Sequence, residues 1–152
     1  MNVQNLIRGA VVALLAAGIA LPALAAADSP VGKWKTIDDN TGKPRGLVEI
    51  TEANGVLTGK ITGRFPKPGD PENPVCDKCE GDKKGKPIVG LVFLEGLKKN
   101  GDEYTDGTIL DPESGKVYSS KLKVTEGGKK IEVRGFIGVS LLGRSQTWIR
   151  EE

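Results

Sequence analysis

The sequence contains no histidine and is poor in cysteine and aromatic residues: its 152 residues include two Cys, two Trp, two Tyr and three Phe. Without histidine the chain cannot build a Ser-His-Asp or Cys-His nucleophile, a His-ligated metal centre or an imidazole pH switch. A large excess of one charge is also missing, because the net charge is only +2, which provides no basic field for nucleic acid. Neither a Gly-x-Gly-x-x-Gly motif nor a Walker loop occurs. We therefore expect a protein that is not an enzyme, holds no cofactor or metal and binds no nucleic acid.

The N-terminal residues 1–25 predict a signal peptide. Residues 1–27 contain no acidic residue and only one basic residue, Arg8, which precedes the apolar run 9–21. This run is shorter than the roughly 20 residues that a helix needs to span a bilayer. The small-residue run 23–27 follows it and is typical of a cleavage site, with cutting after Ala25 or Ala27 fitting equally well. The sequence thus predicts a periplasmic or secreted protein with no membrane span, in which residues 28–152 form a single domain.

The part of the chain after the predicted cleavage site is rich in Gly and Pro, and its apolar residues form short or alternating runs rather than a helical repeat. Turn signals such as Asn54-Gly55 separate the runs, and no connection has the helical pattern that parallel crossovers require. We expect an all-β fold, an antiparallel meander that closes into an eight-stranded barrel, with a two-sheet β-sandwich as the alternative. The predicted strands lie near 31–37, 46–52, 56–63, 88–97, 103–110, 116–125, 130–137 and 144–150.

One predicted strand begins with the run 88–94, which is apolar on both faces. A strand with one wet face would carry a polar residue at every second position, so something must cover the second face. We expect the preceding connection, residues 64–87, to cover it, with Phe65 supplying an apolar contact. A second copy of the chain or another partner is the alternative.

Cys76 and Cys79 form a C-D-K-C motif inside this long connection. In an exported protein the simplest interpretation is a local disulfide that stiffens the loop. A redox pair and a zinc site are the alternatives. The carboxylates of Asp77 and Asp82 would raise rather than lower a thiol pKa, and a structural zinc ion needs four ligands.

The last predicted strand carries long polar and aromatic side chains on one face, at Arg144, Gln146, Trp148 and Arg150. Alternating Arg and Trp residues favour cation–π contacts. The cluster is interpreted either as one that closes the barrel or as an anion-binding site. Acidic pairs such as Asp38-Asp39 fall in predicted turns, where Asp accepts backbone N–H bonds.

Two short motifs stand at the two ends of the domain. Gly32-Lys33-Trp34 lies on the first predicted strand, and Trp148-Ile149-Arg150 ends the last one. Together they resemble the lipocalin-like (calycin) superfamily, in which the G-x-W tryptophan packs against an Arg from near the last strand and closes one barrel end. The resemblance implies that Trp34 is buried and stacked near Arg144 or Arg150.

Five further motifs are spread over the whole domain: V-G-x-W-x-T at 31–36, D-x-C at 77–79, G-x-I-L-D-P at 107–112, V-R-G at 133–135 and L-L-G-R-S-Q-x-W at 141–148. With these motifs the domain resembles a family of small exported bacterial proteins of unknown function. The resemblance implies a lipocalin-like barrel and an exported location, and it carries no known catalytic residue.

These observations favour an exported, non-enzymatic β-barrel that binds a small, largely apolar ligand, with the connection 64–87 as a lid. The alternative is a cell-envelope interaction module whose barrel is filled and binds no small ligand. An open apolar interior of a few hundred Å³ would favour the ligand, and a filled interior would favour the module.

Overall fold

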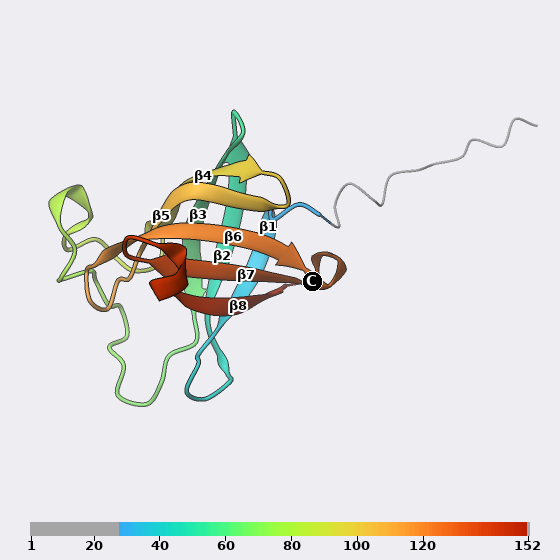
Figure 1. Ribbon diagram of the computed structural model, residues 1–152. Helices are drawn as coiled ribbons and strands as arrows, with labels where there is room; N and C mark the ends of the chain where they lie inside the picture. The colour runs from blue at the N-terminus through green and yellow to red at the C-terminus, as the bar shows by residue number, and fades with distance from the viewer. Residues whose placement is uncertain (1–27, 152) are drawn as a thin grey trace, which may run out of the picture.

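The computed structural model describes residues 28–151, so the predicted signal peptide lies outside the described residues. Each strand pairs antiparallel with the next along the chain, and β1 pairs with β8, which closes the barrel (Figure 1). The meander barrel is confirmed, and the two-sheet sandwich is wrong. The eight strands are β1 (Gly32–Ile37), β2 (Pro44–Ala53), β3 (Val56–Arg64), β4 (Val92–Asn100), β5 (Glu103–Leu110), β6 (Val117–Thr125), β7 (Lys130–Phe136) and β8 (Arg144–Arg150).

Side chains along each strand point alternately into and out of the barrel, and the inward ones fill its interior. Val48 and Ile50 of β2 are buried, and so are Leu57 and Ile61 of β3. The two strands are joined by a two-residue turn in which Asn54 has φ 52° and Gly55 has φ 76°. Asn and Gly tolerate this left-handed backbone better than other residues, which explains why the dipeptide marks the hairpin.

The strand predicted to begin at residue 88 begins instead at Val92. Gly90 has φ 99°, and its N–H donates to the Ile61 carbonyl over 2.7 Å, so residues 88–91 form a turn beside β3. A register shift in the β3–β4 pairing follows, and the consecutive residues Phe93 and Leu94 are both buried. The doubly apolar run is therefore a turn and a bulge as well as a strand.

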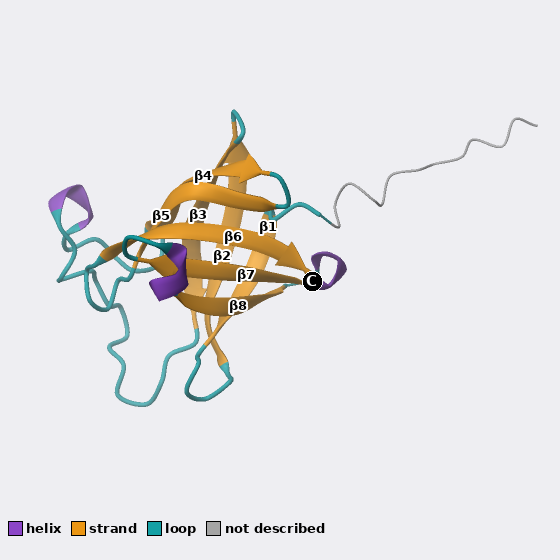
Figure 2. Ribbon diagram, in the orientation of Figure 1, coloured by secondary structure: helices purple, strands orange, loops and turns teal. Residues whose placement is uncertain are grey.

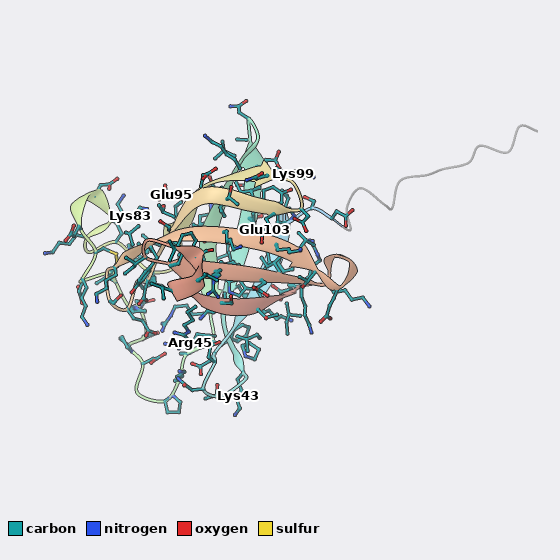
Figure 3. All side chains as sticks on the ribbon, in the orientation of Figure 1. Lys43, Arg45, Lys83, Glu95, Lys99 and Glu103 are labelled. Atoms are coloured by element: carbon teal, nitrogen blue, oxygen red, sulfur yellow. A yellow bond between two sulfur atoms is a disulfide. The ribbon has the colours of Figure 1, made fainter. Side chains whose placement is uncertain are left out.

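The connection before β4 lies against part of this run, as expected. The Ile88 N–H donates to the Pro74 carbonyl of the connection over 3.0 Å, and Lys83 of the connection forms an ion pair with Glu95, which directly follows the run (Figure 3). Val89 and Phe65, however, are exposed to solvent. The connection thus covers the run incompletely, and Phe65 does not supply the buried contact that we expected.

The two ends of the barrel differ. One end, called the mouth below, carries the connections 38–43, 65–91, 111–116 and 137–143, which include the short 3-10 turns η1 (Gly81–Lys83) and η3 (Ser140–Leu142). The other, called the closed end, carries η2 (Glu126–Gly128) and the segment 28–31. Figure 2 shows η1 and η3 on one side of the barrel and η2 on the opposite side, beside the C-terminus. Within residues 28–151, no helix has the length and apolar character to cross a membrane.

Candidate binding cavity and barrel ends

Trp34 and Arg150 meet at the closed end. The Trp34 side chain is fully buried, and its indole N–H donates to the Pro30 carbonyl over 2.8 Å. The Arg150 guanidinium carbon lies 4.2 Å from the Trp34 ring centroid, a distance suited to a cation–π contact. Strands β1 and β8 place the two residues as direct partners in the ladder.

The guanidinium of Arg150 also gathers three backbone carbonyls. It donates to Ser29 O over 2.7 Å, to Gly128 O over 2.6 Å and to Val31 O over 3.1 Å. Gly32 has φ 140°, and a Cβ at this position would lie 2.6 Å from Arg150 Nη1. The glycine of the G-x-W motif is thus required both by its backbone conformation and by the space that the arginine occupies.

A second chain of contacts runs from the barrel interior to the mouth. The indole N–H of buried Trp148 donates to Gln146 Oε1 over 3.4 Å, and Gln146 Nε2 donates to Asp39 Oδ2 over 3.4 Å. Arg144 forms an ion pair with the same Asp39 carboxylate and is largely exposed. Trp148 also contacts Phe93, with ring centroids 5.8 Å apart.

Trp34 and the four residues of the cluster predicted on the last strand are therefore divided between the two ends. Trp34 and Arg150 lie at the closed end, whereas Arg144, Gln146 and Trp148 lead to the mouth. A strand rises about 3.3 Å per residue, so Arg144 and Arg150 share a face but lie roughly 20 Å apart. Arg150, not Arg144, stacks on Trp34.

A cavity of about 990 Å³ opens at the mouth, and side chains of the barrel interior form its floor. The floor is apolar or aromatic: Ile109 and Tyr118 are partly exposed, whereas Phe93, Val133 and Trp148 are buried. The rim of the cavity is polar and charged, and residues Asp39, Arg45, Arg64, Asp70 and Arg144 contribute to it. The cavity therefore offers an apolar interior beneath a charged opening.

Ion pairs on the rim fasten the β3–β4 connection to the barrel. Asp70 Oδ2 lies 2.6 Å from Arg45 Nη1 and 3.0 Å from Arg64 Nη2, and it accepts the Lys67 backbone N–H over 3.0 Å. The hydrogen bond from Arg45 is the main cause that lowers the pKa of Asp70 to about 2. Arg45 Nη2 also lies 3.4 Å from Glu113 Oε1 of the β5–β6 connection.

Asp38 has a similar part in the β1–β2 connection. Its carboxylate pairs with Lys67 and accepts the backbone N–H groups of Asn40 and Thr41, each over 3.0 Å. The Lys67 hydrogen bond is the main cause that lowers the pKa of Asp38 to about 2. Asp38 and Asp70 therefore remain ionised near neutral pH and act as turn and ion-pair groups, because a general acid needs a raised pKa.

Cys76 and Cys79 form a disulfide, and both are buried. No cysteine among the described residues is left free, so the redox and zinc interpretations lack the thiolates that they need. Cys76 Sγ lies 3.5 Å from the Pro112 carbonyl oxygen. At Gly115, whose φ is 73°, a Cβ would overlap the Lys78 carbonyl. The fold thus packs the disulfide loop directly against the β5–β6 turn.

Several residues of the mouth were not predicted as site residues. Asp70 pairs with Arg45 and Arg64, and Asp39 pairs with Arg144, from separate connections and strands, and their charges carry no local pattern that would identify these partners. Arg134 donates to Ser145 Oγ over 2.9 Å and to the Ser140 carbonyl over 2.5 Å. In the sequence, only the V-R-G motif at 133–135 pointed to Arg134 as a residue with a special role.

Comparisons with known proteins agree with this architecture. Residues 32–150 match the model of a family described as "Uncharacterized protein conserved in bacteria (DUF2147)". The match covers all eight strands and both groups of site residues. No curated protein sequence matches the chain significantly.

Among solved structures, the chain is similar to protein HP1028 from Helicobacter pylori, which is described as belonging to the lipocalin family. The TM-score is 0.69, the sequence identity is 20%, and the alignment covers 82% of this chain and 84% of that one. At this identity the likeness concerns the fold, which is a lipocalin-like barrel.

Proposed function

The chain belongs to this family of uncharacterized bacterial proteins, and we propose that it is a binding protein whose barrel takes up a small, largely apolar ligand. The observation that carries the proposal is the cavity of about 990 Å³ that opens at the mouth. Sites for small molecules are typically concave, about 300–1,000 Å³ in volume, and mostly apolar, with a few polar groups that fix orientation.

The distribution of side chains favours an elongated ligand that is apolar at its inner end. Phe93, Ile109, Val133 and Trp148 would lie beneath the inner end. Gln146 follows Trp148 on the same face of β8 towards the rim, and its amide could hydrogen-bond a polar group of the ligand. The likeness to a lipocalin-family protein is compatible with this use of the barrel, because its fold is the same.

The alternative, an envelope interaction module without a ligand, calls for a filled interior. The open cavity at the mouth supports ligand binding, while the interior beneath it is filled by buried side chains such as Trp148 and Val133. We further propose that the protein is exported and has no catalytic activity. The disulfide of Cys76 and Cys79 supports export, since such bonds persist in oxidising compartments. The acidic groups of the mouth support a binding role rather than acid-base catalysis, because Asp38 and Asp70 are held in ion pairs.

Native mass spectrometry of the protein purified without detergent from the envelope fraction of its own host tests the proposal. We expect an additional mass in the range of a lipid-sized or smaller amphiphile, at a stoichiometry of one per barrel. Extraction with organic solvent should remove this mass and leave the protein folded. A protein that carries no additional mass and binds none of the extracted envelope lipids when they are added back would contradict the proposal.

A further inference from the structure

The connection between β7 and β8 presents an uncharged apolar surface at the mouth. Residues 136–143 read F-I-G-V-S-L-L-G and contain no charged side chain. Four aliphatic residues in it point into solvent, with exposed fractions of 69% for Ile137, 59% for Val139, 87% for Leu141 and 79% for Leu142. We call these four residues the apolar tip. Contiguous exposed apolar groups of this kind mark a contact surface rather than an ordinary loop.

The loop is held in place by Arg134 of β7. The Arg134 guanidinium donates to the Ser140 carbonyl over 2.5 Å and to the Leu141 carbonyl over 3.3 Å. At Gly143, a Cβ would lie 2.5 Å from the Gly135 carbonyl, so the end of the loop is pressed closely against β7. The apolar side chains are thus presented by an anchored backbone, which reduces the entropy that a partner would have to remove on binding.

The apolar tip is continuous with the cavity. Ile137 and Leu142 both border the cavity of the mouth, together with Phe136. The two arginines that flank the loop in the sequence both have partners, because Arg134 donates to loop carbonyls and to Ser145 Oγ, and Arg144 pairs with Asp39. A surface that meets the tip would therefore encounter aliphatic side chains first, while both guanidinium groups are held by other contacts.

We propose that the apolar tip docks on a lipid layer by inserting among its uncharged acyl chains, and that this brings the cavity mouth to the lipid surface. The tip is a short turn whose four aliphatic side chains are exposed, which suits insertion among lipid chains better than the packing of a second protein surface. A second copy of the chain is less suitable, because a stable dimer buries about 800 Å² on each partner. One short loop cannot supply that area. The inference goes beyond ligand binding, since docking would occur whether or not the cavity is occupied.

Sedimentation with phosphatidylcholine vesicles tests the docking. We expect the protein without its signal peptide to bind, and the variant Leu141→Ser/Leu142→Ser to partition roughly tenfold or more weakly, because it loses the most exposed apolar groups. The matched control is Ile149→Ser, which removes an exposed aliphatic side chain from β8 near the closed end and should bind as the unaltered protein does. Binding should also be unchanged between low and high salt, since uncharged groups carry it.

A second measurement reports the contact directly. Both native tryptophans are buried, so an indole introduced by Leu141→Trp can be distinguished by its exposure. We expect its emission to shift to shorter wavelength with vesicles and to be quenched by brominated lipid chains. The proposal is overturned if the unaltered protein does not bind, if the double Ser variant binds equally, or if only anionic vesicles bind in a salt-sensitive way. It is also overturned if ultracentrifugation shows that the tip instead forms a dimer that the double variant abolishes.

Discussion

The guanidinium carbon of Arg150 lies 4.2 Å from the ring centroid of Trp34, so the last strand closes over the first through a cation–π contact as well as through their ladder. The same guanidinium donates to three carbonyls of the segment 28–31 and of η2. This contact closes one end of the barrel, so the cavity opens at the other end.

Replacement of Trp34 by alanine should strongly destabilise the fold. The side chain is fully buried, and truncation of a large aromatic residue in a core typically costs about 3–5 kcal/mol. Urea melts would measure the change in the free energy of unfolding. A loss below about 1 kcal/mol would contradict the role of Trp34 in closing the barrel.

The geometry of the guanidinium, and not only its charge, should matter at residue 150. Arg150→Lys keeps the charge but cannot reach three carbonyls with a planar fork, so we expect a loss of about 2 kcal/mol or more. Arg144→Lys is the matched control, because this residue is exposed and holds only a surface ion pair. Its effect should stay within about 0.5 kcal/mol. Equal effects of the two variants would show that Arg150 is not a structural anchor.

The pattern of strands was predictable because local signals determine it. The alternation of Leu57 and Ile61 with polar residues marks one buried face, and Asn54-Gly55 marks a hairpin. The start of β4 was not predictable, because an apolar run does not distinguish a strand from a buried turn. Only Gly90, with its positive φ, distinguished the two in the structure.

The candidate site was predictable only in part. The contact between Trp34 and Arg150 followed from a resemblance. The spacing of Arg144 and Arg150, an even number of residues apart, wrongly suggested one cluster. Such spacing tells which face of a strand a side chain occupies and not how far along the barrel it lies. The partner of Arg144 is Asp39, a residue distant in sequence, and such pairs depend on how the connections fold back.

The disulfide should stabilise the β3–β4 connection measurably. Replacement of both Cys76 and Cys79 by serine should lower the free energy of unfolding by about 2 kcal/mol, the value expected for a very short closed ring. Thiol labelling of the denatured, non-reduced protein should detect no free thiol. Two reactive thiols in that assay would contradict the disulfide.

The ion pairs of Asp70 should give a defined acid dependence. Its pKa is lowered from 3.8 to about 2 in the folded protein, chiefly by Arg45. The ionised carboxylate therefore stabilises the fold above about pH 4, and this contribution is lost as the pH falls towards 2. The difference in stability between the unaltered protein and Asp70→Asn should shrink across that window in urea melts. Asp38, which titrates in the same range, is present in both proteins. A difference that is independent of pH would contradict the assignment.

Ligand uptake by the barrel is tested most directly by titration with an apolar fluorescent probe, N-phenyl-1-naphthylamine. The proteins compared are the unaltered chain and the variants Ile109→Asp and Ile149→Asp, each of which adds one carboxylate. Ile109 borders the cavity, whereas Ile149 is exposed on the outer face, where its ladder partners are Lys35 and Lys130. An apolar molecule that enters beside the Ile109→Asp carboxylate must remove its water, which is costly. We predict saturable binding of one probe per barrel by the unaltered protein and by Ile149→Asp, and a dissociation constant roughly tenfold or more higher for Ile109→Asp, about 1.4 kcal/mol. Absence of saturable binding by the unaltered protein, or equal affinities of the two Asp variants, would contradict a ligand-binding cavity.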